Sequence, residues 1–352
     1  MNDLYLIGNG FDLAHGLETS YNHFLLWYLN SFLEQYRINN YPTQYEDDLL
    51  TVIRNDVRLN FSEYNSVSEL FKGLKDNRYN LKAKHKFFQK IIENYRDFKW
   101  VDIEFEYFLA LVEIYKGLED KNLLRSDFHF SQVTPLNNCF NAIRTALIKY
   151  LQSIEVASER YNPIIEEVLL EKNGPRGNEK GEKLYVYFNY TNTLELYSHN
   201  FLPKSVVQIH GKLSDDSNPI IFGYGDEIHP YYEKIENLNS NEFLKNIKSF
   251  SYFKTNNYQR IMRFIEGNFN SFTVKILGHS CGLSDRILLN TIFEHQNCKA
   301  IKIYYYQKSE TENDYFEKTQ EISRHFKSTS KGEMRNKIVS FERCSPLVPF
   351  TK

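Results

Sequence analysis

Short apolar runs recur along the chain, and each is followed by a small or polar residue. The first is Leu4–Ile7, which is followed by Gly8-Asn9-Gly10. The others lie in the second half of the sequence, at residues 184–190, 206–210, 220–222, 274–277, 300–306 and 337–341. Continuous apolar runs of this kind, separated by helix-like stretches, are typical of a parallel sheet covered on both faces. The pattern predicts an α/β fold with a Rossmann-like, mostly parallel sheet.

The block from residue 22 to residue 165 has apolar residues at helical spacing instead. One face of a helix is predicted by the run Phe105, Phe108, Val112 and Tyr115. Asp102 is placed to cap that helix at its N-terminus. Proline is scarce in this block, and we expect breaks between its helices at Pro42, Pro135 and Pro163.

These two patterns divide the chain into two domains. Residues 1–21 and 172–352 are expected to form an α/β nucleotide-binding core. Residues 22–171 are expected to form a large helical insertion, or cap, after the first strand. The clearest loop in the sequence is the glycine-rich and charged stretch 172–181, where the insertion gives way to the core.

Composition narrows the class of protein. Hydrophobic residues make up 41% of the 352 residues, which is ample for a buried core. The 43 Lys and Arg against 45 Asp and Glu leave a net charge of −2, which argues against a dedicated nucleic-acid binder. Four cysteines are too few for a disulfide scaffold. The N-terminus does not resemble a signal peptide and no apolar run would span a membrane, so we expect a cytoplasmic protein with reduced thiols.

The glycine turn after the first strand is the first candidate for chemistry. Gly8-Asn9-Gly10 lies between a strand and an expected helix, where backbone amides can cradle a phosphate. The same residues can instead form only a tight turn. The third glycine of the dinucleotide fingerprint is replaced by Leu13, which disfavours a dehydrogenase.

Two further strand ends carry polar residues. Asn189 follows the run 184–188 and precedes Thr191, and His210-Gly211 ends the run 206–209. In an open parallel sheet, the carboxyl ends of the strands face the ligand crevice. Asn189 either faces a ligand there or satisfies the start of the next helix. His210 is either a general base at neutral pH or a structural hydrogen-bonding residue.

The loop 278–285 follows the strand expected at residues 274–277. It contains Gly278-His279-Ser280-Cys281-Gly282, which matches the G-x-S-x-G pattern of a serine nucleophile. We disfavour that interpretation, since His210 precedes the serine in the chain. His279 and Cys281, with His295 and Cys298, could supply zinc ligands, but they lack the paired knuckles of a structural site. No metal is expected.

The densest basic patch runs from Lys82 to Lys90 and includes Phe87 and Phe88. A basic surface with aromatic residues can bind nucleic acid. A solvated face of an amphipathic helix is the more common explanation, so we do not expect nucleic acid as a partner.

Together these segments resemble the phage abortive-infection AbiH family. The resemblance spans nearly the whole chain in the right order, through residues 7–21, 100–104, 188–195, 209–211, 221–226 and 278–280. A more distant similarity is to sirtuin-like NAD-binding domains, in which a glycine turn, an Asn, a His-Gly and a late Gly-x-Ser surround NAD. Asn9 and Asp12 depart from that pattern, and the paired cysteines of the zinc module of deacylases are missing.

The sirtuin-like resemblance implies residue roles that the spacing alone does not. Asn189, His210 and Asp12 would be catalytic. The residues implied to bind NAD are Gly8, Asn9, Gly10, Phe11, Tyr21, Thr191, Gly278 and Ser280.

The function implied is that of an antiphage effector that hydrolyses NAD, its substrate, at the nicotinamide–ribose bond. Asn189 would orient water or a ribose hydroxyl, His210 would act as base, and Asp12 would favour positive charge on the sugar. A phage-derived trigger and a homo-oligomer are the expected partners. A nucleotide-binding sensor without turnover, and a nuclease, are the alternatives.

Overall fold

The structure is a computed structural model that describes residues 1–54, 64–76, 79–98, 102–124, 128–171, 181–267 and 271–350. The described chain divides into two compact units. The first unit comprises residues 1–18, 155–228 and 247–352, and the second comprises residues 19–154 and 229–246. Residues 172–180 of the expected loop, and Trp100 and Val101 of the AbiH-like segment, lie outside the described residues.

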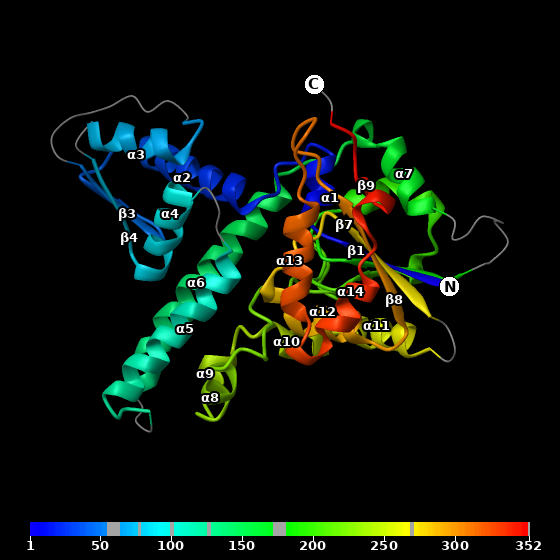
Figure 1. Ribbon diagram of the computed structural model, residues 1–352. Coiled ribbons are helices and arrows are strands. Elements are labelled where there is room, and N and C mark those ends of the chain that lie inside the picture. The colour runs from blue at the N-terminus through cyan, green and yellow to red at the C-terminus, as the bar shows by residue number, and fades with distance from the viewer. Residues whose placement is uncertain are drawn as a thin grey trace. The chain divides into compact units, whose positions relative to one another are not determined.

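A six-stranded, mostly parallel sheet forms the centre of the first unit (Figure 1). Its strands lie in the order β6-β5-β1-β7-β8-β9, and neighbouring strands pair in parallel. Their bounds are β1 Asn2–Ile7, β5 Lys183–Tyr187, β6 Val206–Gln208, β7 Phe272–Leu277, β8 Cys298–Tyr305 and β9 Ser345–Pro346. The chain builds outward from β1 to β5 and β6, then crosses to the other side of β1. The predicted α/β class and parallel sheet are confirmed.

Two of the apolar runs do not form strands. Residues 220–222 are extended but lie outside the sheet, where the Ile221 amide donates to the carbonyl of His210. Residues 337–341 follow the helix α14 (Lys331–Lys337) and contribute only a single bridge, between Ile338 and Ile301. Both runs are short, and length alone does not show whether an apolar segment pairs with a strand or only packs on one.

Alternate residues of each strand enter two separate cores. Leu4 and Leu6 of β1 face one core, together with residues of α11, α12 and α13. Tyr5 and Ile7 face the other, which α7, α1 and the 3₁₀ helix η2 complete. The sheet is therefore covered by helices on both faces. The bounds of these helices are α1 Asn9–Ala14, α7 Pro163–Leu170, η2 Thr193–Asn200, α11 Asn257–Glu266, α12 Arg286–Glu294 and α13 Tyr315–His325.

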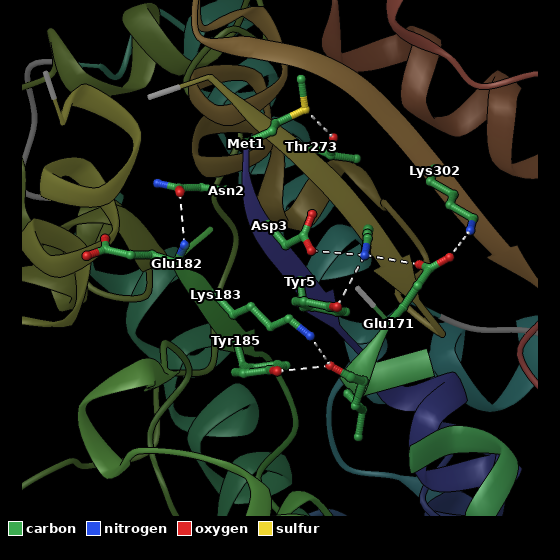
Figure 2. A network of polar contacts seen from close by, with 12 residues as sticks. Met1, Asn2, Asp3, Tyr5, Glu171, Glu182, Lys183, Tyr185, Thr273 and Lys302 are labelled. Carbon is green, nitrogen blue, oxygen red and sulfur yellow. Dashed lines mark hydrogen bonds and ion pairs between the residues drawn. The ribbon is translucent and has the colours of Figure 1, made fainter. Parts of the chain in front are cut away.

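A polar network lies within the α7-facing core (Figure 2). Lys275 of β7 is buried, and its ammonium contacts Asp3 Oδ2 and Glu171 Oε2, each at 3.0 Å. Its Nζ also lies 3.3 Å from the hydroxyl of Tyr5. Lys302 of β8 contacts the other oxygen of Glu171 at 2.8 Å. These ion pairs let charged side chains lie within the sheet core, where an unpaired charge would be costly.

Glu171 links this network to the C-terminal end of α7. Burial alone would raise the pKa of Glu171, but hydrogen bonds from Lys302 and Tyr304 and the charge of Lys275 lower it to about 2. Lys183 and Tyr185 of β5 donate to the Leu169 carbonyl in the last turn of α7. The end of the helix is thus held to the sheet by charge and by hydrogen bonds.

The second unit is mostly helical, as its spacing of apolar residues predicts. Its helices are α2 Tyr21–Ile38, α3 Val67–Asp76, α4 Lys86–Phe98, α5 Ile103–Asp120, α6 Phe128–Gln152, α8 Tyr232–Glu236 and α9 Asn241–Leu244. Asp102 caps α5 as predicted, since its Oδ1 accepts from the Phe105 amide at 3.0 Å. The break expected at Pro135 is wrong, because this proline lies inside α6. Pro163, by contrast, starts α7 of the first unit.

The second unit also contains a three-stranded antiparallel sheet that the sequence analysis does not predict. Its order is β2-β3-β4, with bounds Gln44–Glu46, Leu50–Arg54 and Tyr79–Ala83. Polar residues occupy much of β2 and β4, so the period-two signal of a half-buried strand is weak here.

Candidate functional site

The loops that follow β1 and β7 pack backbone against backbone. The Gly10 amide donates to the Gly278 carbonyl at 2.8 Å. A Cβ on Gly10 would lie 2.7 Å from Gly278 Cα, and one on Gly8 would lie 2.5 Å from His279 Cα. Gly278 has a φ of +67°, which favours glycine, and a Cβ there would meet the Phe11 amide nitrogen at 2.2 Å. Four of the predicted site residues, Gly8, Gly10, Phe11 and Gly278, are therefore brought together.

These contacts account for the glycines through packing alone. The amides of Gly8, Gly10 and Phe11 all donate to backbone carbonyls. Of the two interpretations of Gly8-Asn9-Gly10, the tight turn is the one that the geometry describes. The side chain of Asn9 is exposed beside it.

Asp12 lies at the centre of a first polar cluster. Its Oδ2 accepts from the Thr191 hydroxyl at 2.7 Å, and its Oδ1 accepts from the Tyr187 hydroxyl at 3.2 Å. Thr193 donates in turn to Thr191 at 3.1 Å. The carboxyl group is almost fully buried, with 1% of the residue exposed. Burial raises the pKa of Asp12, and the hydrogen bonds from Thr191, Thr193, Asn189 and Tyr187 oppose that rise.

Asn189 joins this cluster to the glycine turn. Its Nδ2 donates to the Gly8 carbonyl at 3.0 Å, and its side chain is within reach of Asp12. The residue is buried, just beyond the carboxyl end of β5. The predicted residues Gly8, Asp12, Asn189 and Thr191 therefore form one connected group.

His210 lies at the centre of a second polar cluster. Its Nε2 lies 3.0 Å from Asp285 Oδ1, and the Lys248 ammonium contacts the same oxygen at 2.9 Å. Asp285 Oδ2 faces His279 Nε2 at 3.7 Å. All four residues are buried. A carboxylate accepts hydrogen bonds, so Asp285 favours a proton on Nε2 of His210, and the Phe188 backbone is a second hydrogen-bond partner of the ring.

The charges of this cluster shift its pKa values strongly. Burial lowers the pKa of His210 and Lys248 lowers it further, while Asp285 opposes both. Burial would raise the pKa of Asp285, but Lys248 and His210 hold it well below its usual value. Burial lowers the pKa of His279 to about 3. Near neutral pH the cluster thus holds a neutral His210, an ionised Asp285 and a neutral His279.

The two clusters flank the residues that follow β5. The Phe188 ring packs edge-on against His210 at 5.0 Å and against His279 at 4.1 Å, between ring centroids. Its neighbour Asn189 belongs to the Asp12 cluster. Both clusters therefore lie at the carboxyl end of the parallel sheet, where open α/β sheets bind ligands.

Two predicted residues lie apart from these contacts. The Ser280 side chain is exposed, and its Oγ accepts from the Gly282 amide at 3.3 Å. Tyr21 is the first residue of α2 and belongs to the second unit. Phe11 is buried in the α7-facing core, where it packs against His15.

Sequence reasoning missed Asp285 and Lys248. Asp285 is the last residue of the loop 278–285, which the sequence analysis considers. Its position just before the helix α12 is the signal that could have identified it. Lys248 begins the short helix α10 (Lys248–Ser251) and has no motif around it. His15 was also missed; it fixes α1 through the Phe11 carbonyl and the Tyr197 hydroxyl.

The basic patch of the second unit has a structural explanation. Phe87 and Phe88 are buried, and Lys90 forms ion pairs with Glu106 and Glu113. The segment therefore contains an amphipathic helix with its aromatic side inward. Among the described residues, no group of His, Cys, Asp and Glu could hold a metal ion. Nor does any helix in the described ranges have the length and apolar character that crossing a membrane requires.

Comparison with protein families decides the chain's identity. A family model described as "Bacteriophage abortive infection AbiH" matches residues 4–307. The chain belongs to the AbiH family. The match runs from β1 through β8 and so includes both polar clusters. AbiH membership indicates a role in abortive infection by bacteriophage. Comparisons of this AbiH chain with curated proteins and with solved structures find no match.

Proposed function

We propose that this AbiH chain binds NAD at the carboxyl end of its parallel sheet and hydrolyses the nicotinamide–ribose bond. The observation that carries the proposal is the buried His210–Asp285 pair at the end of β6. A neutral imidazole oriented by a carboxylate is the arrangement that general-base catalysis requires. Asp285 is thus a further residue of the proposed site, beyond those that the sequence analysis names.

The strand order supports a dinucleotide as the ligand. Numbered along the chain, the six parallel strands lie in the order 3-2-1-4-5-6, which is the order of dinucleotide-binding Rossmann sheets. Ligands of such sheets bind where the order reverses, here between β1 and β7. A sirtuin-like arrangement of the site belongs to the same proposal, as does a cytoplasmic location, where NAD is abundant.

Both polar clusters contribute residues to the proposed reaction. Water attacks C1′ of the nicotinamide ribose, the C1′–N bond breaks, and its electron pair returns to nicotinamide, which leaves neutral. His210 takes the proton of the attacking water, and Asn189 orients that water or a ribose hydroxyl. The Asp12 carboxylate stabilises positive charge on the sugar, as carboxylates do in glycoside hydrolysis. The products are nicotinamide, ADP-ribose and a proton.

Burial of the site supports a restrained state. Asp12, Asn189 and His210 each expose 6% of their surface or less. An enzyme that destroys NAD must be inactive until infection, and closure of the site would achieve this. We assign its opening to a phage-derived trigger or to self-assembly of the chain.

A nucleotide sensor without turnover is the second candidate. The observation that favours it is the slight exposure of His210, which gives attacking water little access to the proposed base. A sensor would bind NAD and release no nicotinamide.

One experiment separates these functions from a nuclease. The purified chain is incubated with NAD, ATP and RNA, with and without extract of phage-infected cells, and the products are resolved by chromatography. The proposal predicts nicotinamide and ADP-ribose from NAD, with ATP and RNA intact. Cleavage of RNA would replace the proposed NAD hydrolysis with a nuclease activity. Binding of NAD without its cleavage would replace the proposed hydrolysis with the sensor function.

A further inference from the structure

Lys248 is a buried cation that the proposed reaction does not use. Its side chain is fully buried, and its Nζ contacts Asp285 Oδ1 at 2.9 Å. That oxygen is the one that His210 Nε2 contacts at 3.0 Å. A lysine in such a position needs a carboxylate partner, because an unpaired buried charge is strongly unfavourable. Lys248 and His210 therefore share one acceptor, and each affects the other through it.

The backbone before Lys248 is fixed within the first unit. Ile247 forms a parallel bridge with Tyr224, and the Lys248 amide donates to the Tyr224 carbonyl at 2.8 Å. The next residue along that segment, Gly225, accepts from the Ile287 amide at 3.1 Å. The position of the Lys248 ammonium is thus set by backbone contacts close to Asp285.

We propose that Lys248 is a positioning residue that sets the orientation and charge of His210 through Asp285. This inference rests on the proposed role of His210 and names a residue that supports that role without contacting the substrate.

The charges around His210 give the direction of the effect. The ionisable groups that face the imidazole are Asp285, Lys248, His279, Tyr190 and Tyr252. Lys248 lowers the pKa of His210, whereas Asp285 raises it. Without the lysine, Asp285 would face His210 alone and favour the imidazolium. A protonated His210 has no lone pair to accept a proton from water, so withdrawal of Lys248 switches the base off.

The test follows the His210 imidazole by NMR titration of the full chain with isotopically labelled histidine. His210→Gln assigns the signal. We expect Lys248→Met to move the titration midpoint to higher pH, and Lys248→Arg to restore it toward the wild-type value. Lys254→Met changes an exposed lysine nearby and should leave the midpoint unchanged.

Each outcome decides one part of the inference. An unchanged midpoint in Lys248→Met, or in Lys248→Gln if the methionine variant does not fold, would overturn the positioning role. The titration needs no NAD. If the midpoints move as expected while nicotinamide is never released, the proposed hydrolysis fails and this inference stands.

Discussion

The Thr191 hydroxyl donates a hydrogen bond to Asp12 Oδ2 at 2.7 Å and so joins the residues after β5 to the first helix of the chain. Tyr187 donates to the other oxygen of the same carboxyl group. The acid is buried and has hydroxyl donors in place of a cation. Burial raises the pKa of this carboxyl group, so its ionisation costs the folded chain stability, and groups shifted in this way cluster at functional sites.

Asp12→Asn is expected to reveal that cost through its pH dependence. Burial holds the pKa of Asp12 above its usual value of 3.8, so the folded chain binds this proton more tightly than the unfolded chain. The stability that the group contributes is present below that usual value and is lost as pH rises through the folded pKa. Urea unfolding should therefore show Asp12→Asn gaining stability relative to wild type as pH rises above the usual value of 3.8. The exposed Asp216, changed to Asn, is the control. A difference that stays constant with pH, or falls, would contradict the expectation.

Gly278→Ala is expected to disrupt the contact between the two strand-end loops. A side chain at a φ of +67° costs about 1–3 kcal/mol. The Cβ would also lie 2.2 Å from the Phe11 nitrogen, which adds to that cost. Thermal unfolding measures the loss. Gly332→Ala is the control within the first unit, since a Cβ there meets nothing within 4 Å, and it should change stability by about 0.5 kcal/mol or less. Equal melting temperatures for the two variants would argue against the packing described here.

Lys275→Met is expected to destabilise the first unit by about 3–5 kcal/mol, because it leaves Asp3 buried without its cation. Lys299→Met changes an exposed lysine of the neighbouring strand β8 and should have little effect. Denaturant unfolding compares the two variants. A second change at Asp3, Asp3→Asn, should restore part of the loss in Lys275→Met. Additive losses in the double variant would show that the two charges do not interact.

Much of the sheet could be predicted from the sequence. The runs at Leu4–Ile7 and Val274–Leu277 are buried on both faces, so they read as continuous apolar segments, and both form strands. Tyr5 and Lys275 alternate with these apolar residues and form a polar network inside the core. Strand periodicity places Lys275 on the same face as Tyr5, but it does not reveal that ion pairs allow the lysine to be buried.

The candidate site could be predicted where a motif marked it. Asn189 and His210 stand directly after apolar runs, and the rule for parallel sheets places both at the carboxyl end. Asp285 and Lys248 reach His210 through a 3₁₀ turn and a short helix, whose orientation depends on tertiary packing. No local signal in the sequence shows that the two side chains share an oxygen.

The glycine turn shows why one residue pattern fits two explanations. Gly8 and Gly10 were expected either to cradle a phosphate or to form a tight turn. Both uses need a position without a Cβ, so sequence alone does not separate them. In the structure, Gly278 and His279 occupy the space that a Cβ would take, which explains the tight turn and leaves the phosphate role a proposal.

Release of nicotinamide by wild type, His210→Ala and Asn189→Ala tests the central claim most directly. Loss of a general base lowers a rate by about 10²- to 10⁴-fold, so His210→Ala should be nearly inactive, and Asn189→Ala should be strongly impaired. His199→Ala and Asn200→Ala change a histidine and an asparagine of η2 and should retain the wild-type rate. Thermal melting confirms that each variant folds. The account predicts this loss with NAD binding largely retained; wild-type rates in folded His210→Ala and Asn189→Ala, or no release by wild type under any trigger, would contradict it.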